Sequence, residues 1–403
     1  MFLRSSVLVA LALAFVACAG EGTSAAGGRA AEPRRDDGRS DARDGEAPAF
    51  RALEIDSAAS GIEASLRGLS VVDDQTAWAS GSDGSVGVSS DGGKTWRFTR
   101  VPGHEQRDFR DVEALSSSHA LVVAVGAPGI VLETTDGGAS WRERLRDERP
   151  EVFLDAVECF AGGGAEAGSS SRCLLLGDPI DGRFLLFASE DGGASWDALE
   201  GPEALPGEAA FAASGTALRF AADGEVAIAT GGGAQARVLL SHDFGRSWRA
   251  EPVPLAAGAP TRGVFSLAPA APSASTSRTG SEGSSVEPHP ATLPPTDVGW
   301  VAVGGDYSAE DQRAGTVARR AADGSRWLSS TAPPGGYRSA VERLADGRLI
   351  ATGPNGTDVS EDGGATWRPL AGEGFHAVRG ADRGGLALLA GADGRLARLV
   401  FGE

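Results

Sequence analysis

The chain has 403 residues, of which 41% are hydrophobic and 23% charged, and 55 acidic against 37 basic residues give a formal net charge of −18. This length holds one large or two ordinary domains with ample apolar material for a core. The composition excludes a collagen-like or wholly disordered protein, and the acidity excludes sustained binding to nucleic acid, which needs a basic surface.

Residues 1–18 predict an export signal. Arg4 supplies a positive charge, and the apolar stretch Val7–Ala17 is too short to cross a bilayer as a helix but fits the core of a signal peptide. The residues FVAC at 15–18 resemble a bacterial lipobox, although phenylalanine replaces the usual leucine. We expect an exported protein of the bacterial cell envelope, held at the outer membrane or periplasmic face only by lipid on Cys18, with ordinary cleavage and secretion as the alternative.

Two further features of the sequence are a low-complexity segment before the folded part and a pair of cysteines within it. Residues 19–48 are rich in Gly, Ala, Arg and Asp without periodicity, which predicts a flexible tether before a folded part at 49–403. The remaining cysteines, Cys159 and Cys173, form an even pair in an exported chain, and we expect a disulfide between neighbouring strands. No His/Cys cluster with ligand spacing lies nearby, so no metal is expected.

A short motif of the type SEDGGATW recurs along the chain and decides the fold. Five good copies and one worn copy place their Asp and Trp residues at Asp91 and Trp96, Asp136 and Trp141, Asp191 and Trp196, Asp243 and Trp248, Asp323 and Trp327, and Asp362 and Trp367. The copies follow one another at roughly 40–55 residues, apart from one longer interval. That interval contains a Pro/Ser/Thr-rich stretch at about 268–295, which is typical of a disordered insertion.

The motif has a mechanical explanation. Its Asp carboxylate can accept hydrogen bonds from its own turn, its glycines permit positive φ, and its Trp can cover apolar surface between adjacent repeats. Alternating apolar runs precede each copy and predict short antiparallel strands. Each repeat is therefore expected to hold four strands, which is the unit of a β-propeller blade.

The blade count predicts an all-β, seven-bladed β-propeller, with six blades as the alternative. The C-terminal runs supply only three strands, and an N-terminal strand at 50–55 is expected to complete the last blade and remove its free edge. The motif resembles the Asp-box (BNR) repeat of sialidases, sortilin-type receptors and photosystem II assembly-factor-like propellers, and the strand pattern is closest to the last group. Bacterial relatives of that group often carry the label oxidoreductase, but no Gly-rich dinucleotide turn opens a helix here, so no cofactor is expected.

Candidate binding residues cluster on the face opposite the Asp boxes. Alignment of the expected inner strands LRGL, FRDV, FLDA, EAAF, RGVF, YRSA and FHAV gives Arg67, Arg110 and Arg338 equivalent positions. Loops between second and third strands bring further polar residues to this face. The full candidate set is Arg67, Arg110, Arg262, Arg338, His376, Asp155, Asp178, Asp306, Tyr307 and Tyr337. Converging guanidinium groups favour a carboxylate or phosphate, whereas pairing with the nearby carboxylates would make them purely structural.

The sequence thus predicts a non-catalytic propeller without catalytic residues, cofactor or metal, which binds a protein partner or a small anionic ligand or glycan. The alternative is a glycoside hydrolase of sialidase-like type. The resemblance to sialidases implies three arginines on a carboxylate, a Tyr activated by Glu and an acid/base Asp. Tyr307 and Tyr337 are the only tyrosines, and neither has an obvious Glu partner in the sequence.

Overall fold

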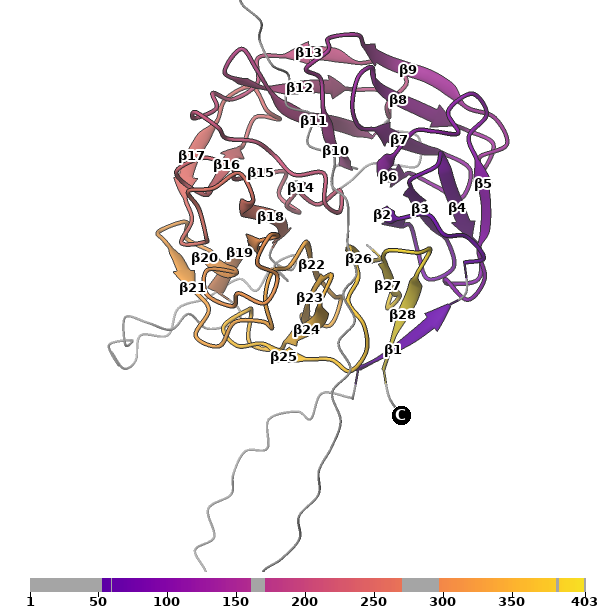
Figure 1. Cartoon of the computed structure of the whole chain (residues 1–403). Helices are drawn as coiled ribbons and strands as arrows, with labels where there is room; N and C mark the ends of the chain where they lie inside the picture. Colours follow the sequence, from indigo (N-terminus) through magenta and orange to yellow (C-terminus); the bar gives the residue numbers. More distant parts are fainter. Residues whose placement is uncertain (1–52, 59, 161–170, 270–296, 382–383, 402–403) are drawn as a thin grey trace, which may run out of the picture. The chain divides into compact units, whose positions relative to one another are not determined.

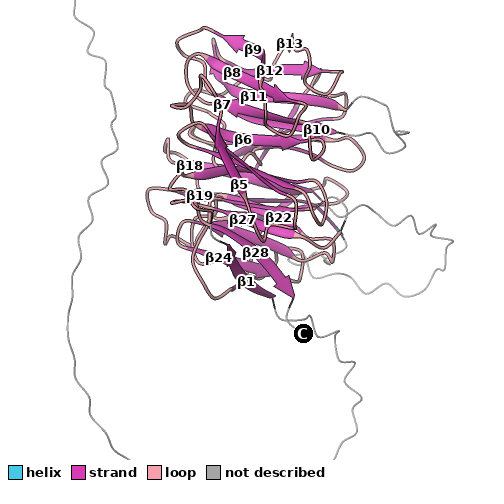
Figure 2. Cartoon of the chain, turned by 90° about the vertical axis from the view of Figure 1, so that its right-hand side faces the viewer, coloured by secondary structure: helices cyan, strands magenta, loops and turns pink. Residues whose placement is uncertain are grey.

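The computed structural model describes residues 53–58, 60–160, 171–269, 297–381 and 384–401. These residues form strands, turns and loops, and none of them lies in an α-helix (Figure 2). Within this part of the chain no helix is therefore long and apolar enough to cross a membrane. The expected signal peptide, the tether and nearly all of the expected insertion lie outside the described residues.

The strands form seven four-stranded antiparallel sheets around a common centre (Figure 1). The first six blades are meanders of consecutive strands, and each begins with its inner strand. Blades one to three comprise β2 (Leu66–Val71), β3 (Ala77–Gly81), β4 (Ser85–Ser89) and β5 (Arg97–Arg100); β6 (Phe109–Ala114), β7 (Ala120–Ala124), β8 (Gly129–Thr134) and β9 (Arg142–Asp147); and β10 (Leu154–Phe160), β11 (Arg172–Ile180), β12 (Arg183–Ser189) and β13 (Asp197–Leu199). Blades four to six comprise β14 (Leu218–Phe220), β15 (Val226–Thr230), β16 (Arg237–Ser241) and β17 (Arg249–Pro252); β18 (Arg262–Pro269), β19 (Val298–Asp306), β20 (Val317–Ala321) and β21 (Trp327–Ser329); and β22 (Ala340–Arg343), β23 (Leu349–Gly353), β24 (Gly356–Ser360) and β25 (Arg368–Pro369).

The seventh blade joins the two ends of the folded chain. Its first three strands, counted from the axis, are β26 (Ala377–Gly380), β27 (Ala387–Ala390) and β28 (Leu396–Phe401). Its outer strand is β1 (Leu53–Ala58), which pairs antiparallel with β28. Figure 1 shows the indigo β1 beside the yellow β28. The predicted closing strand and the count of seven blades are confirmed, but the described strand runs over 53–58 rather than 50–55.

The apolar core is divided among the interfaces between blades. Seven clusters of buried side chains each span two neighbouring blades. In six of them the Asp-box tryptophan packs against the preceding blade; these are Trp96, Trp141, Trp196, Trp248, Trp327 and Trp367. The seventh cluster, between blades six and seven, uses Leu53 and Ile55 of β1 instead.

The Asp boxes stabilise the hairpins between third and fourth strands. Asp362 accepts the Ser360 hydroxyl at 2.8 Å and both the backbone N–H and the hydroxyl of Thr366, at 2.9 and 2.6 Å. The same three contacts recur at Asp91, Asp136, Asp191 and Asp243. Burial alone would raise the pKa of Asp362, but these hydrogen bonds lower it. The worn copy differs, because Ala321 replaces the first Ser and Asp323 accepts the backbone N–H of Ser325.

Two other expectations concern blades three and four. A disulfide joins Cys159 in β10 to Cys173 in β11, which lie opposite each other in the first strand pair of blade three. The inner strand of blade four was expected at EAAF, residues 208–211, and this is wrong, since the strand is β14 at Leu218–Phe220. Glu208 therefore lies outside the inner strand, and its buried carboxylate accepts Arg237 Nε at 2.8 Å and the Thr230 hydroxyl at 2.6 Å.

We predict that Asp362→Ala lowers the free energy of unfolding by about 1–2 kcal/mol, because three hydrogen bonds of the turn are lost and partial exposure to solvent reduces the contribution of each. Asp323→Ala, the matched change in the worn copy, is expected to have a smaller effect. Urea unfolding followed by tryptophan fluorescence measures both. Equal losses in the two variants would show that the complete hydrogen-bond set is not what stabilises the turn.

Candidate functional site

Four inner strands carry a β-bulge at the same place. The extra residue is Arg67 in β2, Arg110 in β6, Asp155 in β10 and Phe265 in β18. A bulge interrupts the alternation of side chains and turns one of them in a new direction. All four lie near the start of their strands, at the end of the central axis opposite the Asp boxes. We call these four residues the bulge ring.

The two arginines of the bulge ring are unequally neutralised. Arg110 is about one-third exposed and its Nε lies 2.7 Å from the Asp108 carboxylate. Arg67 Nη1 donates to the Ala213 carbonyl at 3.3 Å, and no carboxylate of the described residues lies within ion-pair distance of it. Burial, and then the neighbouring Arg110 guanidinium, lower the pKa of Arg67. A negatively charged group placed here would be stabilised by charge-assisted hydrogen bonds.

Two acids accompany the arginines. Asp155 is 1% exposed, and neither carboxylate oxygen accepts a hydrogen bond of normal geometry from the described residues. Burial, and then the Asp178 carboxylate, raise the pKa of Asp155 well above its usual value, against the opposing effect of Arg110. Burial raises the pKa of Asp178 to about 6, although its carboxylate accepts the Ala210 N–H at 2.9 Å. The pair therefore holds protons where isolated aspartates would be ionised.

An aromatic wall adjoins the arginines. The Phe265 ring stacks on Phe211 at 3.8 Å between centroids and meets Tyr337 edge-on at 4.8 Å. Tyr307 is 46% exposed and contacts Phe265 and Tyr337 edge-on at 6.1 and 6.5 Å. Burial raises the pKa of the Tyr337 hydroxyl, while the nearby Arg67 charge opposes this rise. The wall offers apolar contact area beside the guanidinium groups.

His376 takes the position in blade seven that Arg67 takes in blade one. Its Nδ1 lies 3.2 Å from the Leu66 carbonyl. Burial, and then the Arg67 charge, lower the pKa of His376 to about 3. The imidazole is therefore neutral at physiological pH and adds no positive charge to the arginines.

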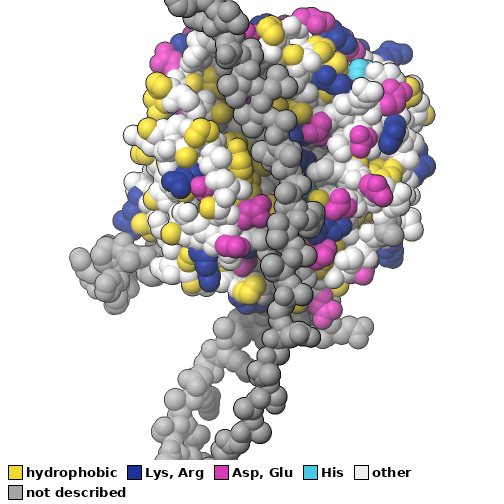
Figure 3. Space-filling view, viewed as in Figure 1, with side chains coloured by type: hydrophobic (Ala, Val, Ile, Leu, Met, Phe, Trp, Pro, Cys, Tyr) yellow, Lys and Arg dark blue, Asp and Glu magenta, His cyan; other side chains and the backbone are white. Residues whose placement is uncertain are grey.

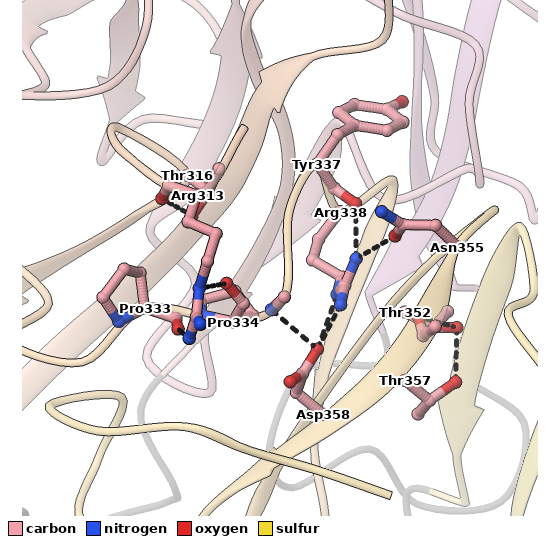
Figure 4. Close-up of polar contacts among 12 residues, drawn as sticks. Arg313, Thr316, Pro333, Pro334, Tyr337, Arg338, Thr352, Asn355, Thr357 and Asp358 are labelled. Atoms are coloured by element: carbon pink, nitrogen blue, oxygen red, sulfur yellow. Dashed lines mark hydrogen bonds and ion pairs between the residues drawn. The ribbon is translucent and has the colours of Figure 1, made fainter. Parts of the chain in front are cut away.

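The expected place of Arg338 is wrong. Register pairs Ala340 with Thr352 and Ala377 with Ala390, so the counterpart of His376 in blade six is Ser339. Figure 4 shows the Arg338 guanidinium directed to Asp358 and Asn355.

The Arg338 pair lies within blade six. Arg338 Nε is 2.8 Å from Asp358 Oδ2, and both side chains are 2% exposed. Arg338 thus stabilises its own blade, because the pair is buried and fully engaged.

The candidates Arg262 and Asp306 neutralise each other. Arg262 lies three residues before the bulge at Phe265, and its Nε is 2.7 Å from Asp306 Oδ2. Burial alone would raise the pKa of Asp306, but hydrogen bonds from Ser308 and Arg262 lower it below its usual range. This ion pair leaves Arg67, Arg110, Asp155, Asp178, His376 and the two tyrosines as the part of the candidate set that electrostatic and ring contacts link.

Sequence reasoning missed the opposite end of the axis. Three residues after the bulge position, the inner strands place Ser70, Glu113, Glu158, Arg219, Glu342 and Arg379 around a cavity of about 730 Å³. The signal was present in the sequence, since a polar or charged residue follows the buried Leu or Val of each of these inner strands in LS, VE, VE, LR, VE and VR. Only the pairing register shows that these six positions are equivalent. No three His, Cys, Asp or Glu side chains of the described chain are grouped as metal ligands.

Fold and motif together define the class of this protein, a seven-bladed β-propeller built from Asp-box repeats. Residues 101–259 match the family Photosynthesis system II assembly factor YCF48. The resemblance to assembly-factor-like propellers is thereby confirmed. No curated protein sequence matches the chain.

Solved structures share the fold at low sequence identity. YCF48 bound to a D1 peptide is 16% identical with a TM-score of 0.56, covering 86% of this chain and 96% of that chain. YCF48 from Cyanidioschyzon merolae is 17% identical with a TM-score of 0.54, covering 86% and 98%. The GH74 xyloglucanase from Xanthomonas campestris is 17% identical with a TM-score of 0.54, covering 86% and 53%. Because binding proteins and enzymes share this fold, the fold does not decide between them.

We predict that Arg338→Ala lowers the free energy of unfolding by about 3–5 kcal/mol, because it leaves the buried Asp358 carboxylate without its partner. Arg110→Ala, the same change at a partly exposed arginine with one ion pair, is expected to cost less than about 1 kcal/mol. Chemical denaturation of both variants measures the difference. A small effect at Arg338 would contradict its assignment to the interior of blade six.

Proposed function

We propose that this protein is an exported, non-catalytic propeller that binds a protein partner. The bulge ring would hold an anionic group of that partner. The observation that carries the proposal is Arg67, a partly buried guanidinium beside a second one and without a carboxylate partner among the described residues. Two like charges held this close raise the free energy of the empty site, and a bound carboxylate or phosphate lowers it.

Two further observations favour a polypeptide as the occupant. The aromatic wall of Phe211, Phe265, Tyr307 and Tyr337 offers apolar area for a side chain next to the anion site. Aromatic and Arg residues are the types that contribute most to protein interfaces. The YCF48 structure that shares this fold was solved with a D1 peptide bound, which agrees with peptide recognition by propellers of this group.

A second candidate function is glycoside hydrolysis of the sialidase-like type. The buried acid pair Asp155 and Asp178 favours it, because a carboxyl group that keeps its proton near neutral pH can act as a general acid. Against it, no hydrogen bond joins the hydroxyl of Tyr307 or Tyr337 to a carboxylate in the described chain. A fluorogenic sialoside tests this reading, and turnover abolished by Tyr337→Phe or Tyr307→Phe would replace the binding proposal.

We predict that sulfate, which stays fully ionised between pH 5 and 8, stabilises the protein against heat, and that Arg67→Ala or Arg110→Ala weakens its binding by about 1.5–3 kcal/mol. Arg262→Ala is the control, because Arg262 lies outside the bulge ring and its guanidinium is paired with Asp306. Thermal shift at a series of sulfate concentrations measures the three variants. Loss of binding in the control alone, or no sulfate effect in the wild type, would leave these arginines purely structural.

The same site predicts a pH dependence with a defined sign. Asp178 has its pKa raised to about 6, so raising the pH through this value adds negative charge next to the anion. We therefore expect sulfate affinity to fall several-fold between pH 5 and pH 7.5. Asp178→Asn is expected to flatten this profile. An affinity that rises with pH would contradict the placement of the acid pair beside the anion.

We also propose that lipid on Cys18 anchors the protein at the cell envelope. The support is the sequence of residues 1–18 alone, which lie outside the described chain. Labelling with a palmitate analogue in the native host is expected to mark the wild type and to miss Cys18→Ala. A Cys18→Ala protein that still labels and stays membrane-bound would refute the anchor.

A further inference from the structure

The cavity at the Asp-box end of the axis is a second, separate site. Its volume is about 730 Å³, within the range of small-molecule pockets, and all seven blades contribute residues to its lining. The ends of the inner strands and the loops that follow them supply an apolar collar, which comprises Val72, Leu115, Phe160, Phe220 and Leu344. Charged side chains of the inner strands line the rest.

Two arginines and two glutamates of the lining neutralise one another. Arg219 lies 3.1 Å from Glu158 and 3.0 Å from Glu342. Arg379 lies 3.0 Å from Glu158 and 3.9 Å from Glu342. All four side chains are at most 11% exposed, so the network is an internal part of the cavity wall rather than a surface feature.

Glu113 also lines the cavity but takes no part in this ion-pair network. Its Oε1 accepts the Cys159 N–H at 3.1 Å, and it forms no ion pair with a basic residue of the described chain. The groups facing it are Glu158 from β10, Arg379 from β26 and Asp111 from its own strand. Burial, and then the Glu158 charge, raise the pKa of Glu113 well above its usual value, because Arg379 is already engaged by other carboxylates.

The charged residues that line the cavity carry a net negative formal charge. Four lining residues are acidic, namely Asp73, Glu113, Glu158 and Glu342, and three are basic, namely Arg219, Arg343 and Arg379. Arg343 is held by the Pro269 and Gly347 carbonyls at the rim. One carboxylate therefore remains without a cation, and it lies beneath an apolar collar.

We propose that this cavity binds a small organic cation, with an ammonium or guanidinium group beside Glu113 and an apolar body against the collar. The proposal is independent of the anion site, which lies at the other end of the axis. Binding converts Glu113 to its ionised form and releases its proton, since the incoming positive charge takes the place that the proton holds in the empty cavity. Affinity for the cation consequently rises with pH.

Calorimetry with three probes of one shape tests the charge preference. The probes are phenylbutylammonium, phenylbutanol and phenylbutanoate, which share the apolar body and differ in charge. We expect the ammonium probe to bind at least about tenfold more tightly than the other two. Repeating the ammonium titration in buffers of different ionisation enthalpy measures the protons released, and we expect a net release from the wild type. Preference for the anionic or neutral probe, or binding without proton release, overturns the proposal.

Glu113→Gln removes the charge and keeps the shape. We expect it to weaken ammonium binding by about tenfold or more and to abolish the proton release. Glu105→Gln makes the same chemical change at an exposed residue in the loop between β5 and β6 and is expected to leave both unchanged. Thermal melting checks that each variant is folded. If Glu113→Gln does not fold, the proton release measured with the wild-type protein decides whether the cation binds beside Glu113.

Discussion

The structure depends on one constraint, that a four-stranded blade can bury its apolar faces only against neighbouring blades. Each of the seven apolar clusters at the blade interfaces is shared by two blades, so none is completed by a single repeat. Six interfaces are completed by an Asp-box Trp from the later blade, and the interface without a box Trp uses Leu53 and Ile55 of β1. The ring must close for the last interface to form, which is why the outer strand of blade seven comes from the other end of the folded chain.

Closure also fixes the chemistry of the axis, because it places the same position of each inner strand at the same height. The bulge turns Arg67, Arg110, Asp155 and Phe265 toward one end, and the residues three positions later lie at the other end. A spacing of three residues therefore separates an end where the Arg67 guanidinium lacks a carboxylate partner from an end with a surplus carboxylate. The two proposed sites differ in the sign of the charge they accept for this reason, although both are built from the same seven strands.

The sequence predicted the Asp-box turns, whose local hydrogen bonds recur in each copy. It did not predict the residue positions that depend on the pairing register of the strands. The Asp boxes were found because Asp, Gly, Ser or Thr and Trp recur in each turn and make the same contacts in five copies. Arg338 was misplaced by one residue, because an alignment of apolar letters cannot see which strand carries a bulge and which does not. The inner strand of blade four was misplaced for a related reason, since the apolar residues of EAAF match the aligned pattern although the strand is formed by Leu218–Phe220. Glu113 has no local motif, and only the pairing of six strands brings its column together.

Asp155, which is buried, and Glu113, which is half-buried, form no ion pair within the described residues and bear on why the axis is polar at all. Burial of an acid without a partner is unfavourable, and an apolar residue at either position would fit the interblade packing with less cost. The fold does not need them, because the blade interfaces are apolar and complete without either side chain. The same inner strands contain satisfied acids, such as Glu158 and Glu342 between Arg219 and Arg379, so the chain can pair its carboxylates where pairing is the purpose. An acid without an ion pair at each end of the axis is therefore better explained by a group that arrives from outside the chain than by the stability of the propeller itself.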